Sequence, residues 1–285
     1  AKVAAKYAKE NNIRFIIDIQ DLWPEAFRMV FNIPIISEIL FYPMKKQANY
    51  IYGIADKIIA VSQTYVNRAL KVNKKCKIGN SVYLSTDLNE FDKLAKYNKF
   101  MGKPKDEIWL AYIGTLGHSY DLISVIDALK IIKDKGINSI KFIVMGDGPL
   151  ESKFKEYAKE KGIYVEFTGR LSYEKMVGIL TVCDIAVNPI KKRSAGSIIN
   201  KVGDYAAAGL PVINTQECAE YRNLVTKYNI GFNCENTNVQ DLVEKILFLY
   251  NDKVLRKLMG ENNRMLAESK FDREKTYKKI IDLLG

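Results

Sequence analysis

The sequence predicts an α/β protein built on parallel sheets. Short β-branched apolar runs alternate with longer segments of helical spacing along most of its 285 residues. This alternation indicates βαβ units, whose crossovers are right-handed and whose strands are parallel. The composition, 48% hydrophobic and 27% charged, is that of a globular protein and excludes disordered, collagen-like and low-complexity classes. The length favours two domains or one large one.

The first part of the chain predicts about half of a doubly wound domain. It opens inside a helical pattern and without an initiator Met, so we expect a fragment of a longer protein. Ser62 follows a strand and is placed to cap the next helix. The expected helices are 1–11 and 36–53, and the expected strands are 14–19, 57–61 and a weaker one at 80–85.

The second part predicts a complete doubly wound domain. A polar, lysine-rich stretch at 86–106 precedes it and is the best linker candidate. We expect a first domain at 1–90, a linker at 91–106, a second domain at 107–270 and a terminal helix at 271–285 that packs back on the first domain. Strands are expected at 108–114, 140–146, 164–169, 183–189, 211–215 and 231–235, with helices at 120–135, 149–161, 172–181, 200–208, 238–250, 252–268 and 272–284.

Composition narrows the possible functions. The single histidine, His118, excludes multi-histidine metal sites, and the four scattered cysteines read as buried thiols in a reducing compartment. The net charge of +11 favours an anionic partner, which is a nucleotide phosphate, a nucleic acid or an anionic membrane. No segment approaches the roughly 20 apolar residues of a membrane helix, and no signal peptide is visible.

Ligands of open parallel sheets bind beyond the carboxyl ends of the strands, so the loops there are the candidate sites. In IGTLGHS (113–119), Gly114 and Gly117 allow the backbone to approach a ligand, and this loop is either a structural turn or a phosphate cradle. MGDGPLESKF (145–154) reads as a tight turn. In FTGRLSYEKM (167–176), Arg170 is either a phosphate or base ligand or a surface ion pair.

The segment 188–214 is the most informative loop. A basic run that ends at Arg193 leads through a small flexible loop to Asn200, the expected helix cap. Lys201 then stands at the helix start, where a cation is unfavourable unless an anion binds. Asp204 lies one turn further on. The basic run could equally be a solvated charge cluster, and Asp204 an exposed helix acid.

A second group of polar residues follows the strand at 14–19. Gln20, Asp21, Trp23 and Glu25 gather at its carboxyl end in DIQDLWPEAF. Asp21 and Glu25 could act as acid, base or hydroxyl ligands, while Trp23 could be a packing residue.

These motifs together carry a family resemblance. The ordered series IGTLG, MGDGP, FTGRLSYEKM, CDIAVNP, NKVGDYAAAGLPVI and FDREKTYKKIIDLL resembles the nucleotide-sugar domain of retaining GT-B glycosyltransferases of family four, the glycosyl transferases group one. DIQDLWPE resembles the acceptor-side domain of capsule and O-antigen enzymes, and YLSTDLNEFD the segment before the interdomain linker. The resemblance implies a GT-B fold, with a doubly wound donor domain and an incomplete Rossmann-like acceptor domain.

The resemblance also implies roles by position. Asp204 stands at the second acid of the family's Glu-x7-Glu motif, which binds ribose, while the first acid falls at Gly196 and is missing. The family's two diphosphate-neutralising cations fall at Thr115 and Tyr120, so Lys201, with Arg170 or Arg193, is the expected replacement. Gln20–Asp21 replaces the family's His-Asp, and we expect Gln20, Asp21 and Lys201 to be catalytic and Trp23 and Glu25 to face the acceptor. The remaining donor-site residues implied are Gly114, Thr115, Gly117, His118, Leu171, Ser197, Ile198, Ile199 and Asn200.

The resemblance implies transfer of a sugar from a UDP- or GDP-linked donor, with retention and without a metal or other cofactor. The leaving diphosphate itself assists attack on the same face. The expected acceptor is a glycan or lipid-linked sugar in surface polysaccharide synthesis on the cytoplasmic side, with no nucleic-acid partner. The segment 41–52 mixes aromatic and basic residues, so it is either a peripheral contact with an anionic membrane or an amphipathic core helix. The alternatives are a nucleotide-binding fragment without catalysis and a GT-B nucleotide-sugar 2-epimerase.

Overall fold

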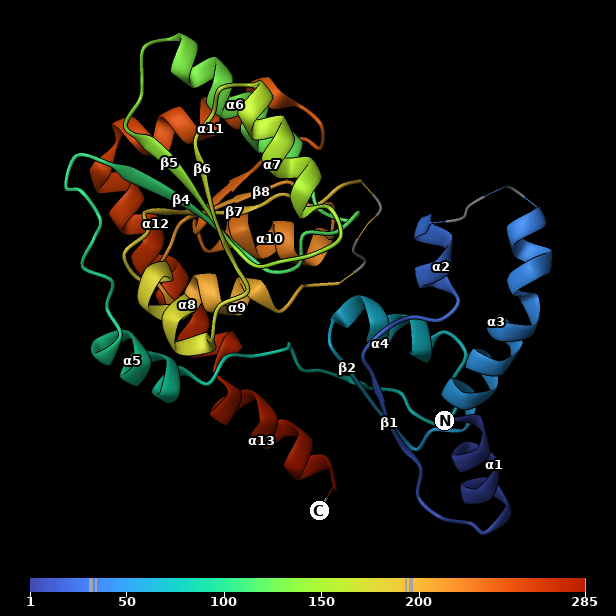
Figure 1. Ribbon diagram of the computed structural model, residues 1–285. Coiled ribbons are helices and arrows are strands. Elements are labelled where there is room, and N and C mark those ends of the chain that lie inside the picture. The colour runs from blue at the N-terminus through green and yellow to red at the C-terminus, as the bar shows by residue number, and fades with distance from the viewer. Residues whose placement is uncertain (31–32, 34, 193, 195–196, 285) are drawn as a thin grey trace. The chain divides into compact units, whose positions relative to one another are not determined.

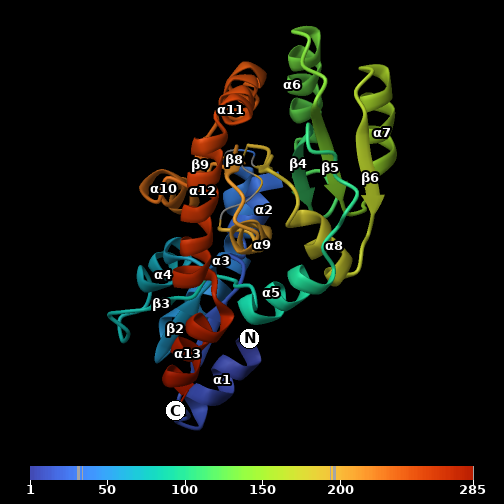
Figure 2. The same cartoon turned by 90° about the vertical axis from the view of Figure 1, so that its left-hand side faces the viewer.

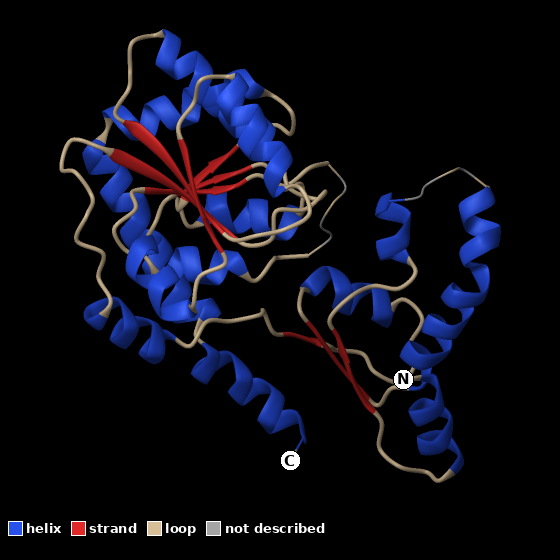
Figure 3. Cartoon of the chain, viewed as in Figure 1, coloured by secondary structure: helices blue, strands red, loops and turns tan. Residues whose placement is uncertain are grey.

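The computed structural model describes residues 1–285 except 31–32, 34, 193, 195–196 and 285, and only the backbone of 28–30. The chain forms two compact units. The first unit comprises Ala1–Leu84, Gly196–Ile198 and Arg273–Gly285, and the second comprises Ser85–Ala195 and Ile199–Asp272. Figure 3 shows the strands of each unit in red, as two separate sheets. The second unit is therefore inserted into the sequence of the first.

The second unit contains a parallel six-stranded sheet in the order β6-β5-β4-β7-β8-β9. The order reverses direction between β4 and β7, which pair through Leu110↔Ile185 and Ala111↔Ala186. This reversal is the topological switch point of a doubly wound fold. The strands are β4 (Ile108–Ile113), β5 (Ile140–Met145), β6 (Val165–Gly169), β7 (Ile185–Asn188), β8 (Val212–Asn214) and β9 (Gly231–Asn233).

Helices cover both faces of this sheet, as the predicted βαβ alternation requires. Figure 1 shows α6, α7 and α11 on one side and α8, α9 and α12 on the other, and Figure 2 shows α6 and α7 beside β4, β5 and β6. Leu110, Phe142, Ile185 and Ile246 belong to the main apolar core on the α6 side. The helices are α6 (Leu122–Asp134), α7 (Glu151–Glu160), α8 (Tyr173–Leu180), α9 (Lys201–Ala207), α10 (Ala219–Lys227), α11 (Val239–Asn251) and α12 (Lys253–Leu266), followed by a π-helical turn, η1 (Ala267–Phe271).

Two of these helices differ from the sequence-based expectation. The lysine-rich stretch expected as a linker contains α5 (Leu88–Tyr97), which Asp87 caps by accepting from Glu90 N at 3.0 Å. Leu88 and Phe91 are buried, so α5 is part of the second unit. Helix α10 was also not expected, since its N-cap position, Cys218, makes no side-chain capping bond and offers no start signal.

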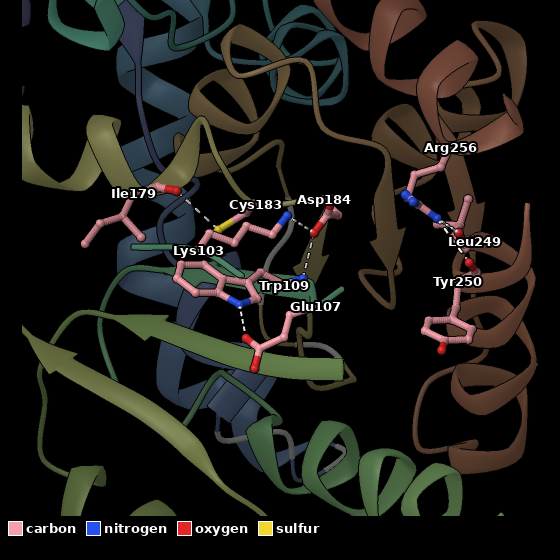
Figure 4. Close-up of polar contacts among 9 residues, drawn as sticks. All are labelled: Lys103, Glu107, Trp109, Ile179, Cys183, Asp184, Leu249, Tyr250 and Arg256. Carbon is pink, nitrogen blue, oxygen red and sulfur yellow. Dashed lines mark hydrogen bonds and ion pairs between the residues drawn. The ribbon is translucent and has the colours of Figure 1, made fainter. Parts of the chain in front are cut away.

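The amino ends of β4 and β7 are held by polar contacts, which Figure 4 shows. The Asp184 carboxylate accepts from Trp109 N at 2.7 Å and forms an ion pair with Lys103. The Trp109 indole donates to Glu107 at 2.7 Å. These contacts lie at the end of the sheet opposite to the loops in which ligands bind. We therefore expect them to stabilise the sheet and not to take part in ligand binding.

The first unit has a parallel sheet in the order β1-β2-β3, with Ile17↔Ile58 and Ile59↔Asn80 in register. Its core includes Ile58, Ala60 and Val66, and Ser62 caps α4 by accepting from Tyr65 N at 3.3 Å. The terminal helix belongs to this unit, where the Arg14 guanidinium donates to the Leu283 carbonyl at 2.9 Å. The elements are α1 (Lys2–Glu10), β1 (Ile16–Ile19), α2 (Glu25–Val30), α3 (Ile36–Ile54), β2 (Lys57–Ala60), α4 (Gln63–Leu70), β3 (Asn80–Ser81) and α13 (Arg273–Leu284).

Candidate functional site

The candidate site lies at the carboxyl ends of β4 and β7, where the strand order of the second unit reverses. The loop after β4 leads to α6, and the loop after β7 leads to α9. The backbone joins them, because Tyr120 and Ile190 form an antiparallel bridge and Lys191 N donates to Ser119 O at 3.0 Å. A ligand at the switch point therefore meets residues from both loops.

Lys201, the first residue of α9, is buried at this point. Its ammonium lies 4.0 Å from the ring centroid of Tyr112 and 3.9 Å from that of Tyr120. Among the described residues the ammonium has no hydrogen-bond partner. Burial lowers the pKa of this ammonium well below the ordinary lysine range, because charge is disfavoured where water is excluded. The two aromatic faces are its principal stabilising contacts.

Gly114 makes room for this lysine. A Cβ atom at this position would lie 2.8 Å from the Lys201 ammonium nitrogen, and the backbone φ of Gly114 is +122°. Both the contact and the dihedral favour glycine. The loop after β4 thus lies directly against the buried ammonium, and an anion held by this loop would neutralise it.

The position of Tyr120 connects this geometry with the sequence resemblance. The family pattern puts a diphosphate-neutralising cation at Tyr120, and this chain has a phenol there. The structure brings the Lys201 ammonium to the face of that phenol. The structure thus places an ammonium from α9 beside the position at which the resemblance leads us to expect a cation.

Asp204 lies one turn after Lys201 on α9, and two hydroxyl groups hold it. Its Oδ1 accepts from Thr86 Oγ1 at 3.0 Å and from Tyr173 OH at 2.9 Å. The absence of a side chain at Gly203 permits this contact, since a Cβ there would lie 2.8 Å from Thr86 Oγ1. The carboxylate is half-buried and has a defined orientation.

We expect Asp204→Ala to lower the affinity for a nucleoside diphosphate about 10- to 100-fold, because the resemblance places this carboxylate as the ribose ligand and a hydrogen bond to a charged group contributes about 1.5–3 kcal/mol. Titration calorimetry measures the effect. Tyr173→Phe is the matched control, because it removes one bond to Asp204 and keeps the carboxylate. Equal affinity of Asp204→Ala and the parent chain would contradict the ribose assignment.

The other expected donor-site residues are spread over the same loops. Arg170 is exposed, and the expected capping by Asn200 is wrong, because its backbone is already helical and its side chain makes no capping bond. Arg193 and Gly196 lie outside the described residues, and Ser197 and Ile198 are grouped with the first unit. Of the rest, Thr115 and His118 are exposed, and Gly117, Leu171 and Ile199 are half-buried.

The expected acceptor-side residues belong to the first unit. Gln20, Asp21 and Trp23 line one part of a cavity of about 500 Å³ that runs along β1. Gln20 Nε2 donates to Asp18 at 2.6 Å. Glu25 does not line this cavity and instead forms an ion pair with Arg68. Its observed role is to hold α2 against α4.

Sequence reasoning missed three residues of this site. Tyr112 reads as an ordinary strand residue, yet its ring forms one wall around the Lys201 ammonium. Thr86 and Tyr173 are separated from Asp204 by 118 and 31 residues, and no local pattern connects them. Thr86 lay in the stretch read as a polar linker, where a hydroxyl gives no distinguishing signal.

The comparisons with known proteins agree with this geometry. The family model described as "Glycosyl transferases group 1" matches residues 95–265. The chain belongs to the glycosyl transferases group 1 family. It is 30% identical over 225 residues to an uncharacterized glycosyltransferase of Methanocaldococcus jannaschii, covering 78% of this chain and 57% of the relative. It is 25% identical over 246 residues to the capsular polysaccharide biosynthesis glycosyltransferase CapM of Staphylococcus aureus, covering 81% of this chain and 61% of CapM.

A solved structure shows the same fold. The structure of Anabaena HepE in complex with UDP matches 99% of this chain and 75% of that protein, with a TM-score of 0.77 at 17% identity. The two-unit parallel α/β architecture is thus the GT-B fold, as the sequence predicts. The chain spans 57–64% of the length of the first curated relatives that it matches.

Two further observations concern other classes of site. Within the described residues, no group of three or more His, Cys, Asp and Glu side chains is arranged to hold a metal ion. No helix in the described part of the chain is long and apolar enough to cross a membrane.

Proposed function

We propose that this glycosyltransferase moves a sugar from a UDP- or GDP-linked donor to a glycan or lipid-linked acceptor, with retention of configuration. The observation that carries the proposal is the buried Lys201 ammonium at the switch point of the second unit, which has two aromatic neighbours but no hydrogen-bond partner among the described residues. A diphosphate is the ligand whose charge and position would complete this site.

In the proposed reaction, the bond between the sugar and the diphosphate breaks, and negative charge develops on the leaving diphosphate. Lys201 stabilises that charge in a site from which water is excluded, where electrostatic interactions are strongest. Asp204 holds the ribose through the orientation that Thr86 and Tyr173 impose. The leaving diphosphate assists attack of the acceptor hydroxyl on the same face of the sugar, so neither a metal ion nor a covalent nucleophile is required.

The acceptor belongs to the first unit in this proposal. Gln20, Asp21 and Trp23 lie together at the carboxyl end of β1, beside the cavity described above. The similarity to CapM supports a role in surface polysaccharide synthesis. A lipid-linked acceptor would place the work of this protein at the cytoplasmic membrane face.

Ligand-induced stabilisation tests the donor assignment. We expect UDP or GDP, and not CMP, NAD or a short DNA, to raise the melting temperature in a thermal-shift panel that contains EDTA. A ligand at 100 times its dissociation constant adds about 2.7 kcal/mol, and about 5–10 °C is expected for a unit of this size. No shift with any nucleoside diphosphate would contradict the proposal. With the donor identified, the anomeric configuration of the product, read by NMR, tests retention.

A further inference from the structure

A buried tyrosine hydroxyl joins the two strands that border the switch point. Tyr205 of α9 is fully buried. Its hydroxyl accepts from Ile113 N at 3.0 Å and donates to Val187 O at 3.2 Å. Ile113 is the last residue of β4, and Val187 lies next to the end of β7. The phenol therefore lies between the backbones of β4 and β7, at the carboxyl ends where the candidate site begins.

This hydroxyl takes the place of a hydrogen bond between the strands. The pairing of β4 with β7 ends at Ala111↔Ala186, whereas β4 pairs with β5 to its last residue. Hydrogen bonds of a parallel ladder are evenly spaced, so the next bond along this register would join Ile113 N directly to Val187 O. The phenol oxygen is inserted between these two groups and keeps the two strand ends apart.

The separation of the strands leaves no backbone group of this bridge unpaired. The hydroxyl accepts from one strand and donates to the other, so both the N–H and the C=O keep a partner, as buried backbone groups require. Burial raises the pKa of the Tyr205 phenol, because the charged form is disfavoured where water is excluded. The hydroxyl thus keeps the proton that it donates.

The same tyrosine governs the position of the buried ammonium. Lys201 and Tyr205 are four positions apart on α9, so they project from the same side of the helix. Tyr205 ties α9 to β4 at Ile113, and the preceding residue of β4, Tyr112, supplies one of the rings that enclose the ammonium. Because the ammonium has no hydrogen-bond partner among the described residues, its place depends on how α9 packs on β4.

We infer that Tyr205 is a positioning residue of the donor site, whose hydroxyl keeps β4 and β7 apart and sets Lys201 at the depth where a diphosphate binds. The phenol is enclosed by the fold and acts on the ligand through Lys201. Without the hydroxyl, Ile113 N–H and Val187 C=O approach each other to pair, and the crevice in front of the ammonium narrows. This inference deepens the proposed function, since it rests on a diphosphate at the switch point.

Tyr205→Phe tests the inference, because it removes the hydroxyl and keeps the ring. We expect the affinity for UDP and for inorganic pyrophosphate to fall about tenfold or more, since a small misplacement of a positioned group is costly. The affinity for uridine should change less than about threefold, because Thr86 and Tyr173 hold Asp204 independently of Tyr205. Titration calorimetry measures UDP and pyrophosphate, and an NMR titration measures uridine. GDP and guanosine replace UDP and uridine if the thermal-shift panel selects GDP.

Tyr157→Phe is the matched control. The Tyr157 hydroxyl donates to Asp127 at 2.7 Å and joins α7 to α6, outside the candidate site. We expect this variant to unfold at a lower urea concentration and to keep the ratio of UDP to uridine affinity of the parent. If that ratio is also kept in Tyr205→Phe, or falls equally in both variants, the inference is overturned, because the Tyr205 hydroxyl then contributes to stability alone.

A double-mutant cycle tests whether Tyr205 acts through Lys201. In a Lys201→Met chain, Tyr205→Phe is expected to lower the affinity for UDP by less than about threefold further, because the group that it positions is already gone. An undiminished loss in that background would contradict the positioning role.

A fluorine probe covers the case in which Tyr205→Phe does not fold. Replacement of Tyr205 by 3-fluorotyrosine retains the hydroxyl and therefore the bridge between the strands. We expect its fluorine resonance to shift when UDP or pyrophosphate is added and to stay in place when uridine is added. A resonance that neither UDP nor pyrophosphate moves would overturn the inference.

Pyrophosphate separates this inference from the proposed function. If the parent chain binds pyrophosphate but no nucleoside diphosphate, and Tyr205→Phe weakens that binding, the transferase assignment fails and the positioning role stands. If Tyr205→Phe binds UDP as the parent does, the positioning role fails and the donor assignment stands. A parent chain that binds neither ligand would overturn both.

Discussion

Lys201→Met is expected to stabilise the ligand-free protein and to weaken nucleoside diphosphate binding about 10- to 100-fold. Methionine fills most of the volume that the lysine side chain occupies between the rings of Tyr112 and Tyr120. It removes a buried cation that has no hydrogen-bond partner among the described residues. Removing an unpaired buried charge adds about 1–3 kcal/mol to the free energy of unfolding. The lost contact with the diphosphate is of similar size, about 1.5–3 kcal/mol, which gives the stated loss of affinity.

Chemical denaturation and titration calorimetry measure these two opposite effects. Lys191→Met is the control, because this lysine lies in the loop after β7 but is exposed. We expect it to change both quantities by less than about 0.5 kcal/mol. A Lys201→Met protein that is less stable than the parent, or that binds the diphosphate equally well, would refute the role assigned to this lysine.

The same residue predicts a dependence on pH. Burial lowers the pKa of Lys201 in the folded chain, so above that pKa the unfolded chain binds more protons. The stability contributed by this group therefore rises with pH, until the ordinary lysine pKa of about 10.4 is passed. The stability advantage of Lys201→Met should be full below the lowered pKa and should disappear as the pH approaches 10.4. An advantage that is constant across this range would show that Lys201 does not titrate differently in the folded state.

Gly146→Ala is expected to destabilise the second unit by about 3 kcal/mol or more and to weaken nucleotide binding with it. A Cβ at Gly146 would lie 2.0 Å from the Gly114 carbonyl oxygen, and φ is +153°. Overpacking costs about 1–3 kcal/mol and a disfavoured backbone conformation adds about 1–3 kcal/mol. Because the atom in the way is backbone, relief requires the loop after β4 to move, and this is the loop that lies against the Lys201 ammonium.

Gly136→Ala separates the two contributions. Gly136 has a φ of +89°, and no atom lies within 4 Å of the added Cβ. The Gly136→Ala substitution therefore introduces backbone strain without a steric clash. We expect a loss of about 1 kcal/mol and unchanged nucleotide affinity. Urea denaturation with and without the nucleoside diphosphate compares the variants. The interpretation of Gly146 as the support of the donor loop fails if both substitutions have the same effect.

The parallel sheets were predictable because their signal is local. Runs such as IWLAYIG and IKFIVMG appear as β4 and β5 within one residue of the expected bounds, since strands buried on both faces read as continuous apolar runs. Helices α5 and α10 were missed for local reasons as well. Half of the positions of α5 are polar and its segment reads as a linker, and α10 has no side-chain cap.

The site was predictable only in part. The resemblance suggested Lys201, with Arg170 or Arg193, as a replacement cation. The burial of Lys201 depends on the packing of α9 against β4, which brings together residues almost ninety positions apart. The sequence predicted this lysine at a helix start, whereas its enclosure by Tyr112 and Tyr120 appears only in the structure. The net charge of +11 is visible in the sequence. That most of it belongs to the first unit, with 17 Lys and Arg against 8 Asp and Glu, could be counted only after the structure had defined the two units.

The insertion of one unit into the other determines the order in which the protein can be completed during synthesis. Residues 85–272 leave the ribosome as one continuous stretch, and all of them except 196–198 belong to the second unit. The bridge between Thr86 and Asp272 brings the two ends of this stretch together. Synthesis of the first unit begins earlier, but this unit is complete only when α13 has been made. The Leu283 carbonyl of α13 accepts a hydrogen bond from the Arg14 guanidinium, which lies 269 residues earlier in the chain. The part that is made first is thus finished last, after the second unit is already complete.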